Sequence, residues 1–150
     1  NLVIFMKEQQ LDALLENINY EISLLSNASA FIKQVFSDIS WVGLTADLGP
    51  FQGKTACTLI PFNKGVCGAC ATNLKTYCVP DVHQFPSHIA CDSATNSELV
   101  IPLIIDNSLY GVLDLDSRCY ARFQPDDQEE LEKLALIIIK HLKRIKEETK

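Results

Sequence analysis

The sequence predicts an α+β fold in which a central antiparallel sheet is flanked by N- and C-terminal helices. Three observations predict it: apolar residues recur at helical spacing near both ends, they fall in short β-prone runs in between, and 150 residues suffice for one domain. We therefore expect residues 1–150 to form a single domain. Its helical region should cover about 7–37, its sheet and loops about 39–120, and its last helix about 125–147.

The N-terminal helical region is predicted from a stripe of apolar residues. They recur at steps of three and four: Leu11, Leu14, Leu15, Ile18, Ile22 and Leu25. Residues 26–29 (Ser-Asn-Ala-Ser) should interrupt this stripe and cap a second short helix that ends at Phe36. Two copies of a chain can also pack through such helices, so the pattern permits a homodimer without requiring one.

The middle of the chain predicts strands, loops and one short helix. Three brief β-prone runs and one small-residue helix are expected over Trp41–Leu44, Ala56–Ile60, Thr76–Val79 and Val66–Thr72, respectively. The strongest strands are Glu98–Ile105 and Leu109–Leu115, joined by a loop at 106–108. The last helix starts at Pro125, with acidic residues in its first turn and basic residues near its end, as the helix dipole favours.

The charge and hydropathy of the chain limit the classes of binding partner and the cellular location that we expect. The net charge of -6 argues against nucleic acid and anionic membranes as partners, because an acidic surface attracts neither. No apolar run approaches the roughly 18 residues that span a bilayer, and no cleavage motif follows the short apolar N-terminus. These features predict a cytoplasmic protein.

Cysteine is unusually frequent, at positions Cys57, Cys67, Cys70, Cys78, Cys91 and Cys119. In a reducing compartment these thiols indicate metal binding, redox catalysis or packing as small apolar residues. Cys67 and Cys70 form a C-x-x-C pair at a predicted helix start, where backbone N–H groups favour a thiolate. The βαβ context of a thioredoxin-like pair is absent, and zinc would require a second close pair, so we expect no metal.

Acidic residues converge on one predicted strand face. Asp114 and Asp116 are two residues apart, so they project from the same face of a strand. Glu98, at the start of the neighbouring strand, can join them. Carboxylates this close repel, which raises at least one pKa and provides an acid near neutral pH. The alternative is the solvated outer face of an edge strand.

The segment 83–92 combines two histidines, a cysteine and an aspartate with little predicted regular structure. An imidazole of His83 or His88 near Cys91 can tune the thiolate fraction of that cysteine. Alternatively, these polar side chains satisfy the backbone of the loop.

Six sequence blocks stand out between residues 49 and 116: Gly49–Lys54 (GPFQGK), Gly65–Gly68 (GVCG), Asp81–Phe85 (DVHQF), His88–Asp92 (HIACD), Asn96–Glu98 (NSE) and Gly111–Asp116 (GVLDLD). In this order they resemble the signature blocks of the free methionine-(R)-sulfoxide reductases, which are GAF-domain enzymes. The resemblance extends from about Trp41 to the C-terminal helix. It implies a single GAF-type domain that reduces free L-methionine-(R)-sulfoxide.

The resemblance also implies roles for particular residues. Cys91 would be the nucleophile that attacks the sulfoxide sulfur, and Cys67 and Cys57 would be the resolving thiols. The pocket carboxylates would be Glu98, Asp114 and Asp116, with catalytic roles for Asp116 and Glu98, and Trp41 would enclose the substrate methyl group. A sulfenic acid on Cys91 would lead to a disulfide, which an external dithiol, thioredoxin in similar enzymes, reduces without a bound cofactor.

Two features depart from the pattern of that family. Similar sequences carry a longer hairpin with a pocket tyrosine after the tryptophan, whereas only Leu44–Leu48 intervenes here. Cys70, Cys78 and Cys119 have no counterpart, and we expect them to pack as small apolar residues. The competing function is a GAF module that senses a small molecule or a redox state without catalysis. Three cysteines together with three carboxylates favour the enzyme.

Overall fold

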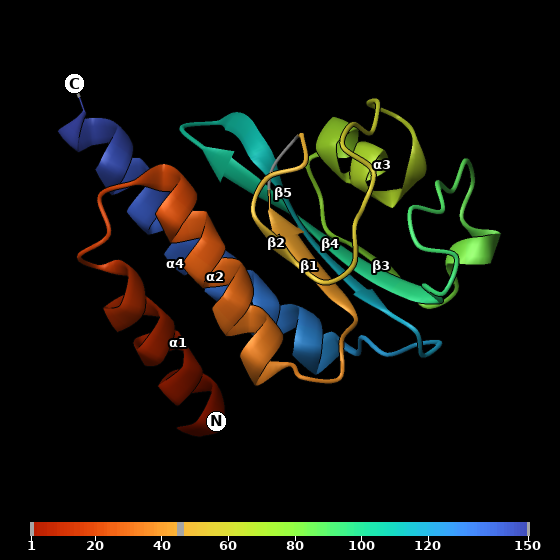
Figure 1. Cartoon of the computed structure of the whole chain (residues 1–150), viewed down its shortest axis with the longest axis horizontal. Coiled ribbons are helices and arrows are strands. Elements are labelled where there is room, and N and C mark those ends of the chain that lie inside the picture. Colours follow the sequence, from red (N-terminus) through yellow and green to blue (C-terminus); the bar gives the residue numbers. More distant parts are fainter. Residues whose placement is uncertain (1, 45–46, 150) are drawn as a thin grey trace.

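The computed structural model of the protein describes residues 2–44 and 47–149. Along the chain the elements are α1 (Leu2–Leu15), α2 (Glu21–Val35), β1 (Trp41–Leu44), β2 (Phe51–Gln52), α3 (Gly65–Asn73), β3 (Tyr77–Val79), the 3-10 turn η1 (Val82–Gln84), β4 (Ser97–Ile105), β5 (Ser108–Ser117) and α4 (Pro125–Glu148). The strands form one antiparallel sheet in the order β2-β1-β5-β4-β3 (Figure 1). The predicted α+β class is confirmed. Thr45 and Ala46, in the short connection after β1, lie outside the described residues.

The two faces of the sheet carry different layers (Figure 1). On one face α2 and α4 pack against the strands and α1 packs against both helices, enclosing a core that includes the fully buried Leu99, Leu113 and Leu115. On the other face a smaller core lies under α3 and includes Val66 and Val100. Side chains alternate along a strand, so the residues between those leucines point to the α3 side. That face carries the polar residues of the site.

The central hairpin fixes the register of these polar residues. β4 and β5 are joined by a two-residue turn, Asp106 and Asn107, whose φ angles are 49° and 63°. Positive φ at both positions is typical of the tight turns that match the twist of antiparallel strands. Ser108 therefore belongs to β5 and not to the loop. In this register Glu98 lies opposite Asp116.

The C-terminal helix α4 is confirmed. It begins with a capping box in which Gln124 and Asp127 satisfy each other's backbone N–H groups. Its buried stripe, which includes Leu131, Leu134 and Ile138, faces the main core. In the described part of the chain, no helix combines the length and the apolar character needed to cross a membrane.

The break between the first two helices lies earlier than predicted. It covers residues 16–20, whereas residues 26–29 lie inside α2. The hydroxyl of Ser26 donates to the carbonyl of Ile22, and that of Ser29 donates to the carbonyl of Ser26. Both hydroxyls are thereby satisfied within the helix, so they do not end it. Leu14 and Ile22, which were expected in the buried stripe, are exposed.

The segment Ala56–Ile60 forms no strand, contrary to prediction. Its one sheet-like pairing is an isolated bridge between Leu59 and Asp47. β-Propensity was a poor guide because the segment carries Cys57 to a sulfur–sulfur bond with Cys91 rather than into the sheet. The short strand β2, which pairs with β1, was not predicted.

Candidate active site

Three carboxyl groups meet on the α3 side of the sheet. Asp114 and Asp116 alternate along β5, which lies in the interior of the sheet between β1 and β4. Glu98 stands opposite Asp116 on β4 and is only 7% exposed. The alternative of a solvated edge strand is therefore wrong, because β5 is flanked by strands on both sides.

Burial and mutual repulsion favour the protonated forms of these carboxyl groups. Burial raises the pKa of Glu98 well above its usual value, and the neighbouring Asp114 and Asp116 raise it further. Burial also raises the pKa of Asp114 to about 6, although hydrogen bonding with Glu98 and Cys67 opposes the shift. The pKa of Asp116 is raised by burial and then by Asp114 and Asp92. At neutral pH the cluster therefore holds acids that can donate a proton.

Cys67 belongs to this carboxyl cluster. It lies in the first turn of α3, and its thiol donates a hydrogen bond to Oε1 of Glu98 at 3.7 Å. Burial, followed by the charges of Asp114 and Glu98, raises the pKa of the Cys67 thiol well above its usual value. The expectation that the helix start favours a thiolate here is wrong, because burial and the surrounding carboxyl groups together outweigh the backbone N–H groups.

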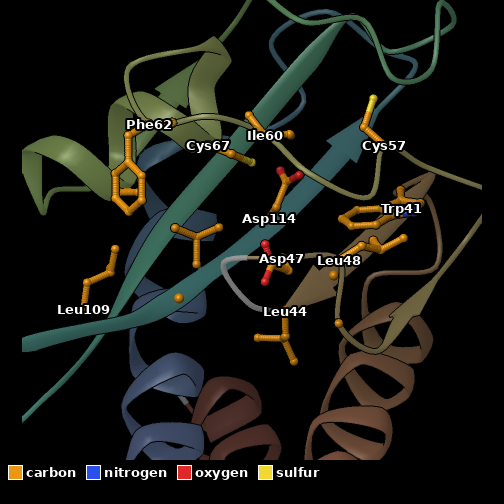
Figure 2. Close-up of a pocket in the computed structure, with 16 residues that line it drawn as sticks. Trp41, Leu44, Asp47, Leu48, Cys57, Ile60, Phe62, Cys67, Leu109 and Asp114 are labelled. Atoms are coloured by element: carbon orange, nitrogen blue, oxygen red, sulfur yellow. The ribbon is translucent and has the colours of Figure 1, made fainter.

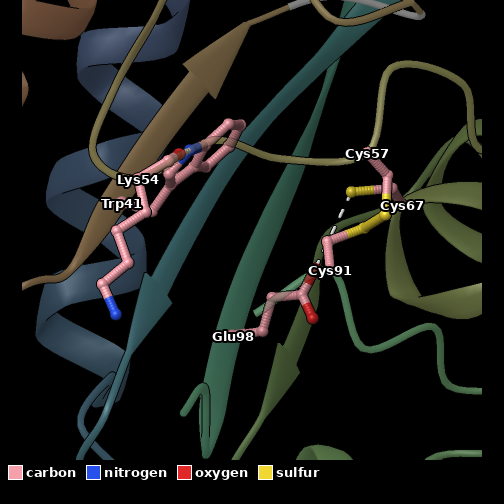
Figure 3. Close-up of a disulfide and its surroundings, with 6 residues drawn as sticks. All are labelled: Trp41, Lys54, Cys57, Cys67, Cys91 and Glu98. Carbon is pink, nitrogen blue, oxygen red and sulfur yellow. Dashed lines mark hydrogen bonds between the residues drawn. A yellow bond between two sulfur atoms is a disulfide. The ribbon is translucent and has the colours of Figure 1, made fainter. Parts of the chain in front are cut away.

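The two other cysteines of the predicted set are bonded to each other. Cys57 and Cys91 form a disulfide of 2.02 Å that joins two irregular loops beside the cluster (Figure 3). Among the described residues no imidazole bonds to Cys91: the ring of His83 bonds instead to Oδ1 of Asn96 at 3.0 Å. His88 packs beside His83, and burial followed by the charge of His83 lowers the pKa of His88.

Two adjoining cavities surround this group of residues. They share Trp41, Cys57, Ile60 and Asp114 in their walls. The first is lined mainly by apolar side chains from β1, β5 and the segment before α3 (Figure 2). The second is more polar than the first and is called the polar cavity here, and its walls include the disulfide partner Cys91 and the carboxyl group of Asp116.

Trp41 separates the cavities from the edge of the sheet. Its ring stacks on Phe51 with the centroids 5.5 Å apart, and its Nε1 donates to the carbonyl of Lys54 at 3.1 Å. The indole lies across β1 because the next residue on the same face of that strand is Gly43, where a Cβ would come within 1.9 Å of the ring. Trp41 is therefore held as a fixed wall of the site, with Phe51 as a supporting residue that was not predicted.

Donor atoms from three elements also come close enough to hold a metal ion. The Cys67 Sγ and one carboxyl oxygen each from Glu98 and Asp114 lie within 4.8 Å of one another. Within residues 2–44 and 47–149 this is the one such group of three donors. The two carboxyl oxygens of this group are also suitable acceptors for an ammonium group, because that group is cationic too.

The cysteines outside the family pattern divide into two kinds. Cys70 is fully buried, its thiol donates to the carbonyl of Val100 at 3.7 Å, and burial raises its pKa to about 12. It packs as a small apolar residue, as predicted. Cys78 and Cys119 are exposed, so the prediction is wrong for them. Cys78 lies on the edge strand β3, and Cys119 lies just past the end of β5, where no layer covers it.

The raised pKa of Asp114 has a consequence for stability. We expect Asp114→Asn to increase the free energy of unfolding, relative to the wild type, as the pH rises through 6. The pKa of Asp114 is about 6 in the folded protein and 3.8 for an ordinary solvated aspartate, as in the unfolded chain. Between these two values the unfolded chain ionises more readily, so the wild type loses stability as the pH rises. Asparagine cannot ionise, so the variant escapes this loss. Urea unfolding at several pH values measures the difference. An equal difference at pH 4 and pH 8 would contradict the assignment, and exposed Glu147→Gln serves as the control.

The fold and this site together define a GAF-domain protein with a thiol and carboxyl centre. A family model for the GAF domain matches residues 8–142. The free methionine-R-sulfoxide reductase of Escherichia coli is 44% identical over 119 residues, which cover 75% of this chain and 72% of that protein. The chain belongs to the family of free methionine-R-sulfoxide reductases.

Two further relatives agree with this placement. The free methionine-R-sulfoxide reductase of Saccharomyces cerevisiae is 48% identical over 130 residues, covering 77% of this chain and 72% of that protein. The structure of the free methionine-R-sulfoxide reductase from Neisseria meningitidis in complex with its substrate superposes with a TM-score of 0.89 at 37% identity, over 93% of this chain and 88% of that chain.

Proposed function

We propose that this protein reduces free L-methionine-(R)-sulfoxide to methionine at the expense of thiols. One observation carries the proposal: the Cys57–Cys91 disulfide borders a polar cavity that is also lined by the partly buried carboxyl groups of Asp114 and Asp116. Thiols supply the electrons for reducing a sulfoxide, and a carboxylic acid supplies the proton that its oxygen needs. The similarity to the reductases of the bacterial and yeast relatives supports the same reaction.

The first half-reaction transfers oxygen from the substrate to Cys91. The Cys91 thiolate attacks the sulfoxide sulfur while Asp116, assisted by Glu98, donates a proton to the sulfoxide oxygen. The substrate sulfur gains two electrons and leaves as methionine. Cys91 loses two electrons and keeps the oxygen as a sulfenic acid.

The second half-reaction forms the disulfide. The thiol of Cys57 attacks the Cys91 sulfenic acid, an S–S bond forms, and the oxygen leaves as water. Cys67 stays a predicted second resolving thiol. Because its thiol also donates a hydrogen bond to Glu98, Cys67 has a second role, which is to orient the Glu98 carboxyl group.

An external dithiol then has to restore the two thiols by exchange. We propose thioredoxin as this partner, since two successive exchange steps need a protein dithiol that can reach the disulfide. No bound cofactor enters the cycle, because all the electrons come from thiols. Dependence on thioredoxin places the protein in a reducing compartment, for which we propose the cytoplasm.

The carboxyl cluster also accounts for a preference for the free amino acid. A group of buried acids is a favourable site for the substrate ammonium, which becomes an amide when methionine is part of a peptide. Asp114 supports this role, because its Oδ1 is buried without a hydrogen-bond partner in the described part of the chain. Trp41 and the apolar cavity wall then enclose the methyl group.

We also propose that residues 1–150 act as one domain and that two such domains associate. Several apolar side chains on the N-terminal helices are exposed, among them Phe5 and Met6 on α1 and Ile22 on α2. Exposed apolar side chains on these helices favour association of two copies.

Incubation with free methionine-(R)-sulfoxide and dithiothreitol, followed by chromatography of methionine, tests the function. We expect turnover of the free R epimer and negligible turnover of the S epimer or of N-acetylated methionine sulfoxide. A GAF module that only senses a ligand would release no methionine from any of them. Comparable rates on the N-acetylated compound would contradict recognition of the ammonium by the carboxyl groups.

A further inference from the structure

We propose that Arg118 forms a subsite for the α-carboxylate of the free amino acid, at the rim of the polar cavity. The inference rests on the proposed function and adds to it the recognition of the second charged group of the substrate. With Asp114 and Asp116 it would make the site complementary to a zwitterion.

Arg118 is placed by the same strand as the two aspartates. Side chains two residues apart share a face of a strand, and Arg118 continues the alternation of Asp114 and Asp116 just past the end of β5. It lines the polar cavity together with Asp116 and Cys91. Its backbone is anchored there, because the Asn96 side-chain amide donates to the Arg118 carbonyl at 2.7 Å.

The guanidinium of Arg118 is not engaged elsewhere. The other two arginines of the chain are structural: Arg122 binds the carboxylates of Asp38 and Asp127, and Arg144 binds Glu148 and backbone carbonyls at the end of α1. Within the described ranges 2–44 and 47–149, the Arg118 side chain has neither a hydrogen bond nor an ion pair. A chain with net charge -6 thus leaves one arginine available at its polar cavity.

The chemistry of the group fits a carboxylate. A guanidinium presents two parallel N–H groups that match the two oxygens of a carboxylate, whereas an ammonium acts as a point charge. The other cation of this cavity is Lys54, whose side chain is directed away from the disulfide in Figure 3. Asp92, which also lines the cavity, accepts a hydrogen bond from the backbone N–H of Ala94. Arg118 is therefore the cation best placed for the substrate carboxylate.

The test compares two variants on two substrates. For Arg118→Gln we expect KM for free methionine-(R)-sulfoxide to rise about tenfold or more, as for loss of a charge-assisted hydrogen bond, with kcat within about threefold. Arg118→Lys should recover part of the lost affinity, because lysine keeps the positive charge but lacks the two parallel N–H groups of the guanidinium. The carboxamide of the substrate, which lacks the negative charge, should raise KM for the wild type but hardly further for Arg118→Gln. Lys64→Gln, an exposed cation outside both cavities, is the matched control.

An unchanged KM in Arg118→Gln would overturn the subsite, as would equal discrimination against the carboxamide by variant and wild type. Failure of the proposed function gives a different result, namely no turnover by the wild type. In that case calorimetric titration with L-methionine and L-methioninamide decides the subsite. The subsite is supported if the wild type binds L-methionine more tightly than L-methioninamide and Arg118→Gln loses this preference. It is refuted if the wild type binds both compounds equally or binds neither.

Discussion

Cys91→Ser is expected to abolish turnover of free methionine-(R)-sulfoxide, to below about one thousandth of the wild-type rate, while the fold persists. A serine hydroxyl supplies no appreciable nucleophile at neutral pH, whereas a cysteine supplies a thiolate. Methionine release measured with excess dithiothreitol gives the rate, and circular dichroism reports the fold. The partly exposed position of Cys91 in an irregular loop gives the substitution little effect on packing.

Cys57→Ser is the matched comparison, since it removes the other half of the same disulfide. It should release about one methionine per protein in a first turnover and then slow strongly when thioredoxin is the reductant, because the sulfenic acid on Cys91 has lost its disulfide partner and only Cys67 remains to resolve it. A carbon nucleophile selective for sulfenic acids, such as a cyclic 1,3-diketone, should then label Cys91. Substantial activity of Cys91→Ser would move the nucleophile to another cysteine, of which Cys67 is the first to test.

Asp116→Asn is expected to lower turnover by roughly 100-fold, in the range of the loss of a general acid. The amide fills the same space on β5 but carries no acidic proton for the sulfoxide oxygen. The pH dependence of the rate separates this role from a structural one, because the limb that reports the acid should disappear in the variant. Asp126→Asn, an exposed change in the first turn of α4, is the control. If the Asp116→Asn rate and pH profile matched the wild type, Glu98 would be the acid.

The elements that follow from local sequence patterns were predictable. The alternation in Leu109–Leu115, the turn before it and the amphipathic stripe after Pro125 each depend on near neighbours in the chain, and these elements are confirmed. The convergence of Glu98 on Asp114 and Asp116 could also be predicted, because a tight hairpin leaves few registers for its two strands.

Features that depend on distant partners were not predictable from local patterns. Ala56–Ile60 has the composition of a strand, yet its position is governed by the disulfide between Cys57 and Cys91. These two cysteines are 34 positions apart in the sequence. The neutral state of Cys67 depends on its burial and on carboxyl groups of two strands, so the helix start alone predicted a shift of its pKa in the wrong direction. Arg118 could not be predicted as a site residue, because an exposed arginine gives no sequence signal of its own. Its position becomes informative only once the cavity beside it is known.

The Cys57–Cys91 bond turns part of the chain into a covalent ring that contains α3 and β3. In the proposed cycle this ring exists only between the formation of the disulfide and its reduction. While it is closed, the number of conformations open to the two loops is limited by a bond, and when it is open only packing limits them. Local opening, as amide hydrogen exchange would report it, is then fastest in the dithiol state. That is the state that admits a new substrate, so entry to the cavity is easiest when the chemistry is ready to begin.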